Sequence, residues 1–169
     1  MKKEILVLAL GSNVGNRHQY LQQARASLVL IFGPMLAESP VYESDPWGVQ
    51  HSTRYLNQVL VFATEYDAVS ILEFTQEAEK KMGRRQKGDL SPRTLDIDIL
   101  YLGRQVVQKP QLFIPHPRIE QRKFVLQPLE DVLPGFLHPV LLKSQKELNR
   151  QPETLNQIIK VWKPMAEYI

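Results

Sequence analysis

Strand-like and helix-like segments follow one another along this chain in an order that restricts the fold. Residues 5–10 form a continuous apolar run, and residues 55–64 and 94–102 are two further segments typical of strands. Apolar residues recur at helical spacing within 20–31 and within 69–82. Because these segments do not alternate as regular strand–helix–strand units, the sequence predicts an α+β sandwich with a largely antiparallel sheet rather than a doubly wound parallel fold.

The expected helices carry start signals, and the remaining segments are assigned by composition. Asn16 and Asp67 stand where the two helices begin, and both residue types cap helix N-termini well. Residues 83–93 are rich in glycine and charge, which predicts a mobile loop. We expect a turn, a short helix and a second short helical turn within 114–134. A terminal helix is expected over 152–162, with a proline in its first turn.

Length and composition restrict the class of protein. A chain of 169 residues suits one compact domain over residues 1–169. It contains no cysteine, which excludes disulfides, a thiol nucleophile and a cysteine-ligated zinc site and fits a cytoplasmic protein. No apolar stretch approaches the length needed to cross a membrane. The net charge of +3 is compatible with nucleic acid, with an anionic small substrate or with a merely solvated basic face.

Two aspartates one residue apart are the most informative chemical feature. Asp96 and Asp98 interrupt the apolar residues of the segment 94–102. On a strand, residues i and i+2 point to the same face, so the two carboxylates project together while Ile97 projects the other way. Carboxylates this close repel each other unless a positive charge, such as a hard divalent cation, offsets the repulsion. Arg93 and a basic stretch precede the pair, a combination suited to a magnesium–polyphosphate site.

Four sequence blocks carry a resemblance to a known enzyme family. They are LALGSNVGNR at 8–17, YLNQVLVFAT at 55–64, SPRTLDIDIL at 91–100 and IPHPRIEQRKFVLQPL at 114–129. In this order they resemble 6-hydroxymethyl-7,8-dihydropterin pyrophosphokinase, the folate-pathway enzyme that moves a pyrophosphoryl group from ATP to a pterin alcohol. The aspartate block and the order of the blocks are specific together, whereas an Asp-x-Asp pair alone is weak. The fold we expect is therefore a ferredoxin-like α/β sandwich.

On the nucleotide side, the resemblance assigns roles to the residues that match the family. It implies that Asp96 and Asp98 bind two Mg²⁺ ions, which bridge the phosphates of the co-substrate ATP and the pterin hydroxyl. The implied phosphate ligands are Arg93, His116 and Arg122, and the other implied nucleotide contacts are Gln76, Glu79 and Ile99. The basic loop at 84–91 would close over ATP and supply a catalytic arginine. Arg84 is our candidate, with Arg85 and Lys87 as alternatives.

On the pterin side, the implied contacts also agree with the chemistry of the ligand. The residues are Ser44, Trp47, Tyr55, Asn57 and Phe124. A flat heterobicycle packs well against aromatic faces, which Tyr55 and Phe124 provide. Its donor–acceptor edge suits a side-chain amide, which Asn57 provides.

The expected reaction is an in-line attack of the pterin hydroxymethyl oxygen on the β-phosphorus of ATP, with AMP as the leaving group. No side chain stands out as an obligatory base, so positioning and charge neutralisation would supply most of the rate. We expect only the pterin and ATP as partners, no nucleic acid or membrane, and a cytoplasmic monomer.

Two rival functions remain open from the sequence. A magnesium-dependent nucleotide hydrolase needs the same acids and arginines but no pterin pocket. An RNA-binding module fits the basic balance, but such modules present aromatic residues on the sheet face rather than two acids. The simplest structural alternative is a strand whose outer face happens to carry acids.

Overall fold

An antiparallel sheet is the central element of the structure, a computed structural model that describes residues 2–45, 54–83 and 94–164. In chain order the elements are β1 (Glu4–Ser12), α1 (Arg17–Phe32), β2 (Ala37–Glu38), β3 (Tyr42–Ser44), β4 (Tyr55–Thr64), α2 (Ala68–Lys81), β5 (Asp96–Leu102), β6 (Val107–Lys109), β7 (Leu112–Ile114), the 3₁₀ turn η1 (Ile119–Gln121), α3 (Lys123–Val132), α4 (Gln145–Leu148), α5 (Pro152–Leu155) and β8 (Ile159–Val161). The main sheet has the order β5-β1-β4-β3-β8, with β2 also paired to β4, while β6 pairs with β7. Its pairings are all antiparallel, which confirms the predicted sheet type.

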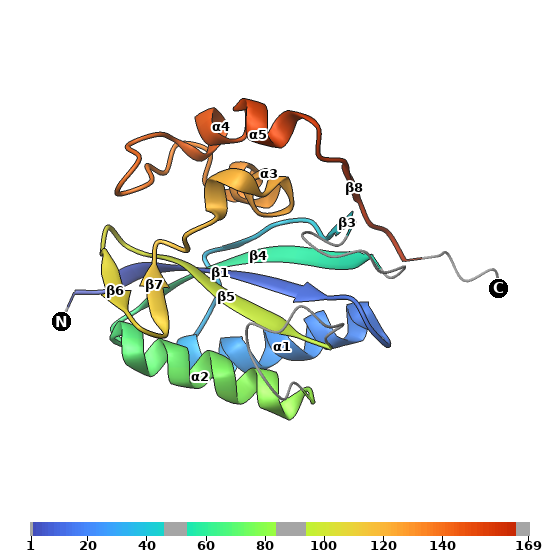
Figure 1. The fold of residues 1–169 in the computed structure, drawn as a ribbon. Helices are drawn as coiled ribbons and strands as arrows, with labels where there is room; N and C mark the ends of the chain where they lie inside the picture. The colour runs from blue at the N-terminus through green and yellow to red at the C-terminus, as the bar shows by residue number, and fades with distance from the viewer. Residues whose placement is uncertain (1, 46–53, 84–93, 165–169) are drawn as a thin grey trace.

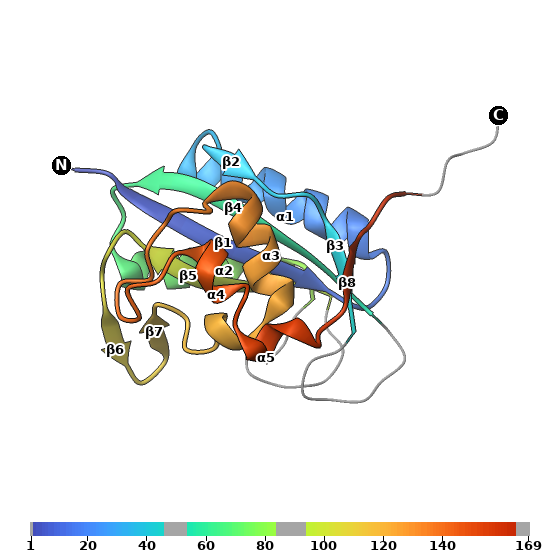
Figure 2. The same cartoon turned by 90° about the horizontal axis from the view of Figure 1, so that it is seen from above.

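Helices cover both faces of this sheet, as Figures 1 and 2 show. α1 and α2 lie on one face, and α3, α4 and α5 lie on the other. Along β1, Leu6, Leu8 and Leu10 belong to the core on the α1–α2 side, while Val7 belongs to the core beneath α3. Successive strand residues point to opposite faces, so a strand that is buried on both faces is a continuous apolar run.

One extra residue in β5 changes which face the second half of the strand presents. Ile99 pairs with Leu8 and Tyr101 pairs with Val7, so Leu100 is inserted between two paired positions as a β-bulge. As a result, Leu100 and Tyr101 both pack in the core beneath α3. The first half of β5 keeps the strict alternation that sets the direction of its two acids.

The two long helices begin where their capping residues predict. The Asn16 side chain accepts the backbone N–H of Gln19 at 3.2 Å, and α1 follows. The Asp67 side chain accepts the backbone N–H of Ser70 at 2.8 Å, and α2 follows. Both bonds satisfy N–H groups that have no partner within the helix.

Within the described ranges, no helix combines the length and the apolarity that a bilayer crossing requires.

The C-terminal segment differs from the predicted helix. Only Pro152–Leu155 is helical, and Ile159–Val161 instead forms β8, which pairs with β3. The edge of β3 offers backbone groups for pairing, and the β-branched residues of β8 suit a strand, so sheet pairing outweighs the local helical pattern.

The region 114–134 also differs in detail from the prediction. The 3₁₀ turn Ile119–Gln121 comes first, and the helix that follows it has ten residues and is therefore longer than a single turn. The loop predicted over 83–93 lies, from residue 84 onward, outside the described residues.

Candidate active site

A hollow opens between the sheet and the N-terminal end of α3. We call it the first hollow, and it is lined mainly by Ala9, Gly11, Ser44, Tyr55, Asn57, Asp96, Asp98, Arg122 and Phe124. It contains about 720 Å³ of empty space, part of which is open to solvent.

Small residues on β1 give the first hollow its depth. Gly11 pairs with Asn57 on one side and with Asp96 on the other, so these three positions share one face of the sheet. A Cβ atom at Gly11 would lie 3.7 Å from the Tyr55 ring and 3.8 Å from the Asn57 side-chain oxygen. The glycine therefore leaves room for about one methyl group at the floor, between the acids of β5 and the amide of β4.

Asp96 and Asp98 both line the first hollow, as their i, i+2 spacing predicts. Each is half-buried, whereas Ile97 between them is buried in the core on the opposite face. Among the described residues, no cluster of three or more His, Cys, Asp or Glu side chains gathers. Two carboxylates at an open hollow fit Mg²⁺, which commonly takes one or two protein carboxylates and completes its shell with water and phosphate oxygens.

A buried hydrogen bond fixes the amide on β4. The Asn57 Nδ2 donates to the Ser44 Oγ at 2.7 Å, and each residue is 5% exposed. The bond runs between β4 and β3, where Ser44 pairs with Tyr55. It holds the Asn57 amide in one orientation, with its oxygen available as an acceptor.

The start of α3 supplies a cation and an aromatic ring. The guanidinium carbon of Arg122 lies 5.6 Å from the centroid of the Phe124 ring, within the range of a cation–π contact. Both side chains line the first hollow, opposite the sheet. An anionic group and a flat ring could therefore both find partners at this wall.

A second hollow lies next to the first, and Asp98 of β5 lines both. It is lined by Leu72, Ile97, Asp98, Ile99, Gln111, Leu112, Phe113, His116 and Pro117, and it contains about 550 Å³ of empty space. The apolar walls of the second hollow suit a flat base, and the shared carboxylate lies where the two hollows meet.

His116 reaches the second hollow from the segment after β7. Its backbone N–H donates to the Leu100 carbonyl at 3.0 Å, which fixes this segment to β5. Its ring Nδ1 accepts the backbone N–H of Arg118 at 3.3 Å. In the neutral ring the proton is then on Nε2, which is a donor.

Comparison with known protein families is decisive. The profile of the family described as 7,8-dihydro-6-hydroxymethylpterin-pyrophosphokinase matches residues 7–134. The chain belongs to this family. A Bacillus subtilis 2-amino-4-hydroxy-6-hydroxymethyldihydropteridine pyrophosphokinase is 36% identical over 160 residues, which are 94% of this chain and 90% of the relative. An enzyme of the same name from Porphyromonas gingivalis W83 is 42% identical over 139 residues, 80% of this chain and 94% of the relative.

Solved structures share the fold. The crystal structure of Plasmodium falciparum HPPK-DHPS wild type with pteroate matches with a TM-score of 0.69 at 18% identity. The match covers 87% of this chain but only 42% of that chain. This likeness agrees with the α/β sandwich expected from the sequence.

The pyrophosphokinase family fixes the reaction. The enzyme transfers pyrophosphate from its co-substrate ATP to 6-hydroxymethyl-7,8-dihydropterin, giving the pterin diphosphate and AMP, in folate biosynthesis. The predicted family and activity are thus confirmed. Nothing in the comparisons supports the nucleotide hydrolase.

The structure brings most of the predicted pyrophosphokinase site residues together. The first hollow gathers Ser44, Tyr55, Asn57, Asp96, Asp98, Arg122 and Phe124, and the second gathers Ile99 and His116. Gln76 is half-buried on α2 and Glu79 is 2% exposed there, and neither is among the described residues that line these hollows. Five predicted site residues lie outside the described residues, namely Trp47, Arg84, Arg85, Lys87 and Arg93.

Sequence reasoning missed several residues of these hollows. The strand predicted from the apolar run stops at residue 10, but β1 continues through Gly11 to Ser12. Phe113 comes from β7, a three-residue strand too short to give a periodic signal, and Gln111 lies in the turn that precedes it. The sequence does carry a signal for the floor of the first hollow, because Ala9 and Gly11 are small residues within an otherwise bulky apolar strand.

Proposed function

We propose that Asp96 and Asp98 hold two Mg²⁺ ions at the boundary of the two hollows. The observation that carries this proposal is that Asp98 lines both hollows while Asp96 lines the first beside it. When bound, Mg²⁺ neutralises phosphate charge and lowers the pKa of the pterin hydroxyl. Oxygen ligands on one strand face, open to a substrate, suit a hard cation that retains water and phosphate ligands.

The first hollow would bind the pterin. Asn57, oriented by Ser44, would recognise the polar edge of the ring through its carbonyl oxygen and backbone neighbours. Tyr55 and Phe124 would pack on the ring faces. Trp47 is proposed from the family resemblance alone.

The second hollow would bind the nucleotide. Its apolar walls, including Ile99, would contact the base, and the Nε2–H of His116 would donate to a phosphate. Gln76 and Glu79 on α2 remain proposed nucleotide contacts from the resemblance. The triphosphate would then run past Asp98 toward the first hollow, with its β-phosphorus beside the pterin hydroxyl.

The residues of this chain would act by positioning and by neutralising charge. The pterin hydroxyl oxygen attacks the β-phosphorus, the bond from that phosphorus to the oxygen bridging it to the α-phosphate breaks, AMP leaves, and the hydroxyl proton passes to solvent. Arg122 would hold a phosphate from the α3 wall. Arg93 would act likewise, and Arg84, or its neighbours Arg85 and Lys87, would arrive with the closing loop.

Replacing Asp98 tests the metal assignment. In Asp98→Asn we expect AMP formation from ATP, pterin and Mg²⁺ to fall by at least about 100-fold, because the carboxylate that lines both hollows and holds Mg²⁺ is lost. The circular dichroism spectrum should not change, since the side chain is only half-buried. Glu65→Gln, at an exposed position away from both hollows, is the matched control. AMP formation by Asp98→Asn within a few-fold of the wild-type rate would refute the assignment.

We further propose one domain over residues 1–169, acting as a monomer in the cytoplasm. The absence of cysteine supports a reducing compartment. Both hollows are formed within one chain, which supports a monomer. Light scattering coupled to size exclusion should give a mass near 19.5 kDa, and a dimer mass would contradict this proposal.

A further inference from the structure

The segment after α5 reaches back to the edge of the first hollow. Gln157 lies outside residues 7–134, the range that the family profile matches. Its side-chain Oε1 accepts the backbone N–H of Lys123 at 3.0 Å, and its Nε2 donates to the backbone carbonyl of Gln121 at 2.6 Å. One amide therefore holds the main chain on both sides of Arg122, which lines the hollow.

α3 begins beside Arg122 without a cap of its own. Arg122 occupies the N-cap position, and its side chain makes no capping hydrogen bond. The first N–H groups of a helix lack partners inside the helix, and a Ser, Thr, Asp or Asn at the N-cap usually satisfies one of them. With any of these residues at the N-cap in place of Arg122, the hollow would lose its guanidinium group. The oxygen of Gln157 supplies the acceptor for Lys123 instead.

We infer that Gln157 is a positioning residue for Arg122: it caps α3 from the C-terminal segment and holds the peptide groups on both sides of Arg122, whose side chain lines the first hollow. The inference rests on the proposed function of Arg122 as a phosphate ligand. Because the peptide groups on both sides of Arg122 are held, its side chain can extend from the main chain in fewer directions. Small displacements of a charged ligand are costly to catalysis.

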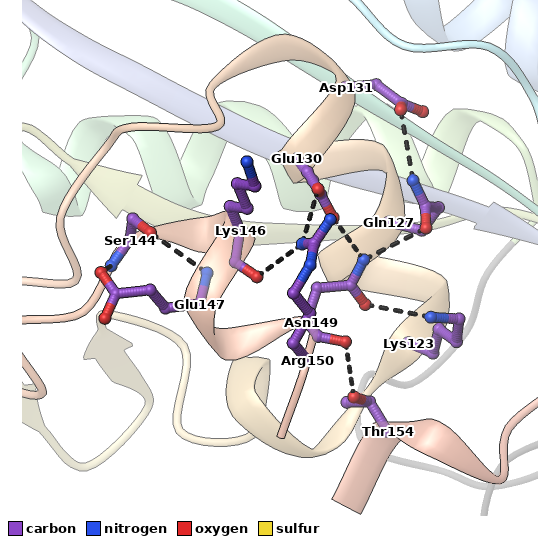
Figure 3. A network of polar contacts seen from close by, with 10 residues as sticks. All are labelled: Lys123, Gln127, Glu130, Asp131, Ser144, Lys146, Glu147, Asn149, Arg150 and Thr154. Carbon is purple, nitrogen blue, oxygen red and sulfur yellow. Dashed lines mark hydrogen bonds and ion pairs between the residues drawn. The ribbon is translucent and has the colours of Figure 1, made fainter. Parts of the chain in front are cut away.

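The C-terminal segment is anchored on both sides of Gln157, which makes it a firm support. The second amide proton of Gln157 is donated to the Glu153 carbonyl at 2.9 Å. Upstream, Thr154 donates to the Asn149 carbonyl at 2.9 Å, and Asn149 joins the polar network on α3 shown in Figure 3. Downstream, β8 pairs with β3, the strand that carries Ser44. The same segment thus touches two walls of the first hollow.

The test compares Gln157→Ala with Ser144→Ala as a matched control. The Ser144 side chain accepts the N–H of Glu147 at 3.1 Å and caps α4, so its removal also deletes one helix cap, but away from the hollow. With MgATP and the reduced pterin, we expect kcat of Gln157→Ala to fall about tenfold while KM for the pterin changes less than about threefold. Ser144→Ala should keep both constants within about twofold. Melting temperatures of both variants set an assay temperature at which each is folded.

Two further readouts separate the possible outcomes. Hydrogen exchange at the Lys123 amide should accelerate at least about tenfold in Gln157→Ala and not in Ser144→Ala, whether or not the enzyme turns over. Adding Gln157→Ala to Arg122→Ala should lower kcat by less than about twofold more, because the positioned group is already gone. A wild-type kcat in the single variant, or a further tenfold loss in the double variant, overturns the inference. A wild type that forms no AMP refutes the proposed function instead, and the exchange result still tests the contact.

Discussion

Asn149 joins α3 to the C-terminal helices, and its removal should cost more stability than any exposed change nearby. Its Nδ2 donates to Glu130 at 2.6 Å and to Gln127 at 3.1 Å, and its Oδ1 accepts from Lys123 at 3.3 Å (Figure 3). The side chain is 4% exposed. The bond to the carboxylate is worth about 1.5–3 kcal/mol and each weaker bond about 0.5–1.5 kcal/mol. Arg150 stays bound to Glu130 at 2.7 Å and compensates for part of the loss.

We therefore expect Asn149→Ala to lower the free energy of unfolding by about 3 kcal/mol. For a chain of this size that is a fall in Tm of roughly 6–12 °C. Urea unfolding followed by circular dichroism measures the first quantity, and a thermal melt measures the second. The control is Lys146→Ala, because the Lys146 backbone carbonyl, which accepts from Arg150, is kept in the variant, and the Lys146 ammonium acts on Glu130 only through its charge. A loss below about 1 kcal/mol in Asn149→Ala, or an equal loss in the control, would refute the reasoning.

Two other predictions concern the floor of the first hollow and the alkaline limit of stability. Gly11→Ala should fold, because its methyl group would lie 3.7 Å from the Tyr55 ring, an ordinary van der Waals distance. The methyl group takes space from the substrate, so KM for the pterin should rise about tenfold or more. An unchanged KM would contradict this role for the glycine. Burial raises the pKa of the Tyr101 hydroxyl well above its ordinary value of 10.0. Above pH 10 the unfolded state therefore loses a proton that the folded state keeps. The contribution of Tyr101 to the free energy of unfolding is complete below pH 10 and is lost as the pH rises further. Urea unfolding at pH 9, 10 and 11 should show a shallower alkaline decline in Tyr101→Phe than in the wild type, and parallel curves would contradict the assignment.

The parts of the fold that depend on local pattern could be predicted from the sequence. Asn16 and Asp67 cap helices because a short side-chain acceptor satisfies N–H groups only three residues away. Asp96 and Asp98 share a face because a strand alternates with a period of two. Both inferences need only neighbouring residues, and both hold in the structure.

The parts that depend on distant partners could not be predicted in this way. Ile159 and its neighbours become a strand only because β3 offers an edge to pair with. The bond from Asn57 to Ser44 requires the register between two strands, which no single segment specifies. Gln157 caps α3 across 34 positions of sequence, so the usual signal of a capping residue next to the helix is absent.

Because of the β-bulge at Leu100, the side-chain directions at one end of β5 are set independently of those at the other end. Beyond the bulge, Tyr101 faces the α3 side, although a regular strand would turn it to the other layer. The interior under α3 gains a large aromatic residue there, while the acidic end keeps its own alternation. Substitutions that repack the neighbourhood of Tyr101 can therefore accumulate during evolution without re-aiming either carboxylate. An inserted or deleted residue between the bulge and Asp98 would instead turn both acids to the opposite face of the sheet, away from the substrates.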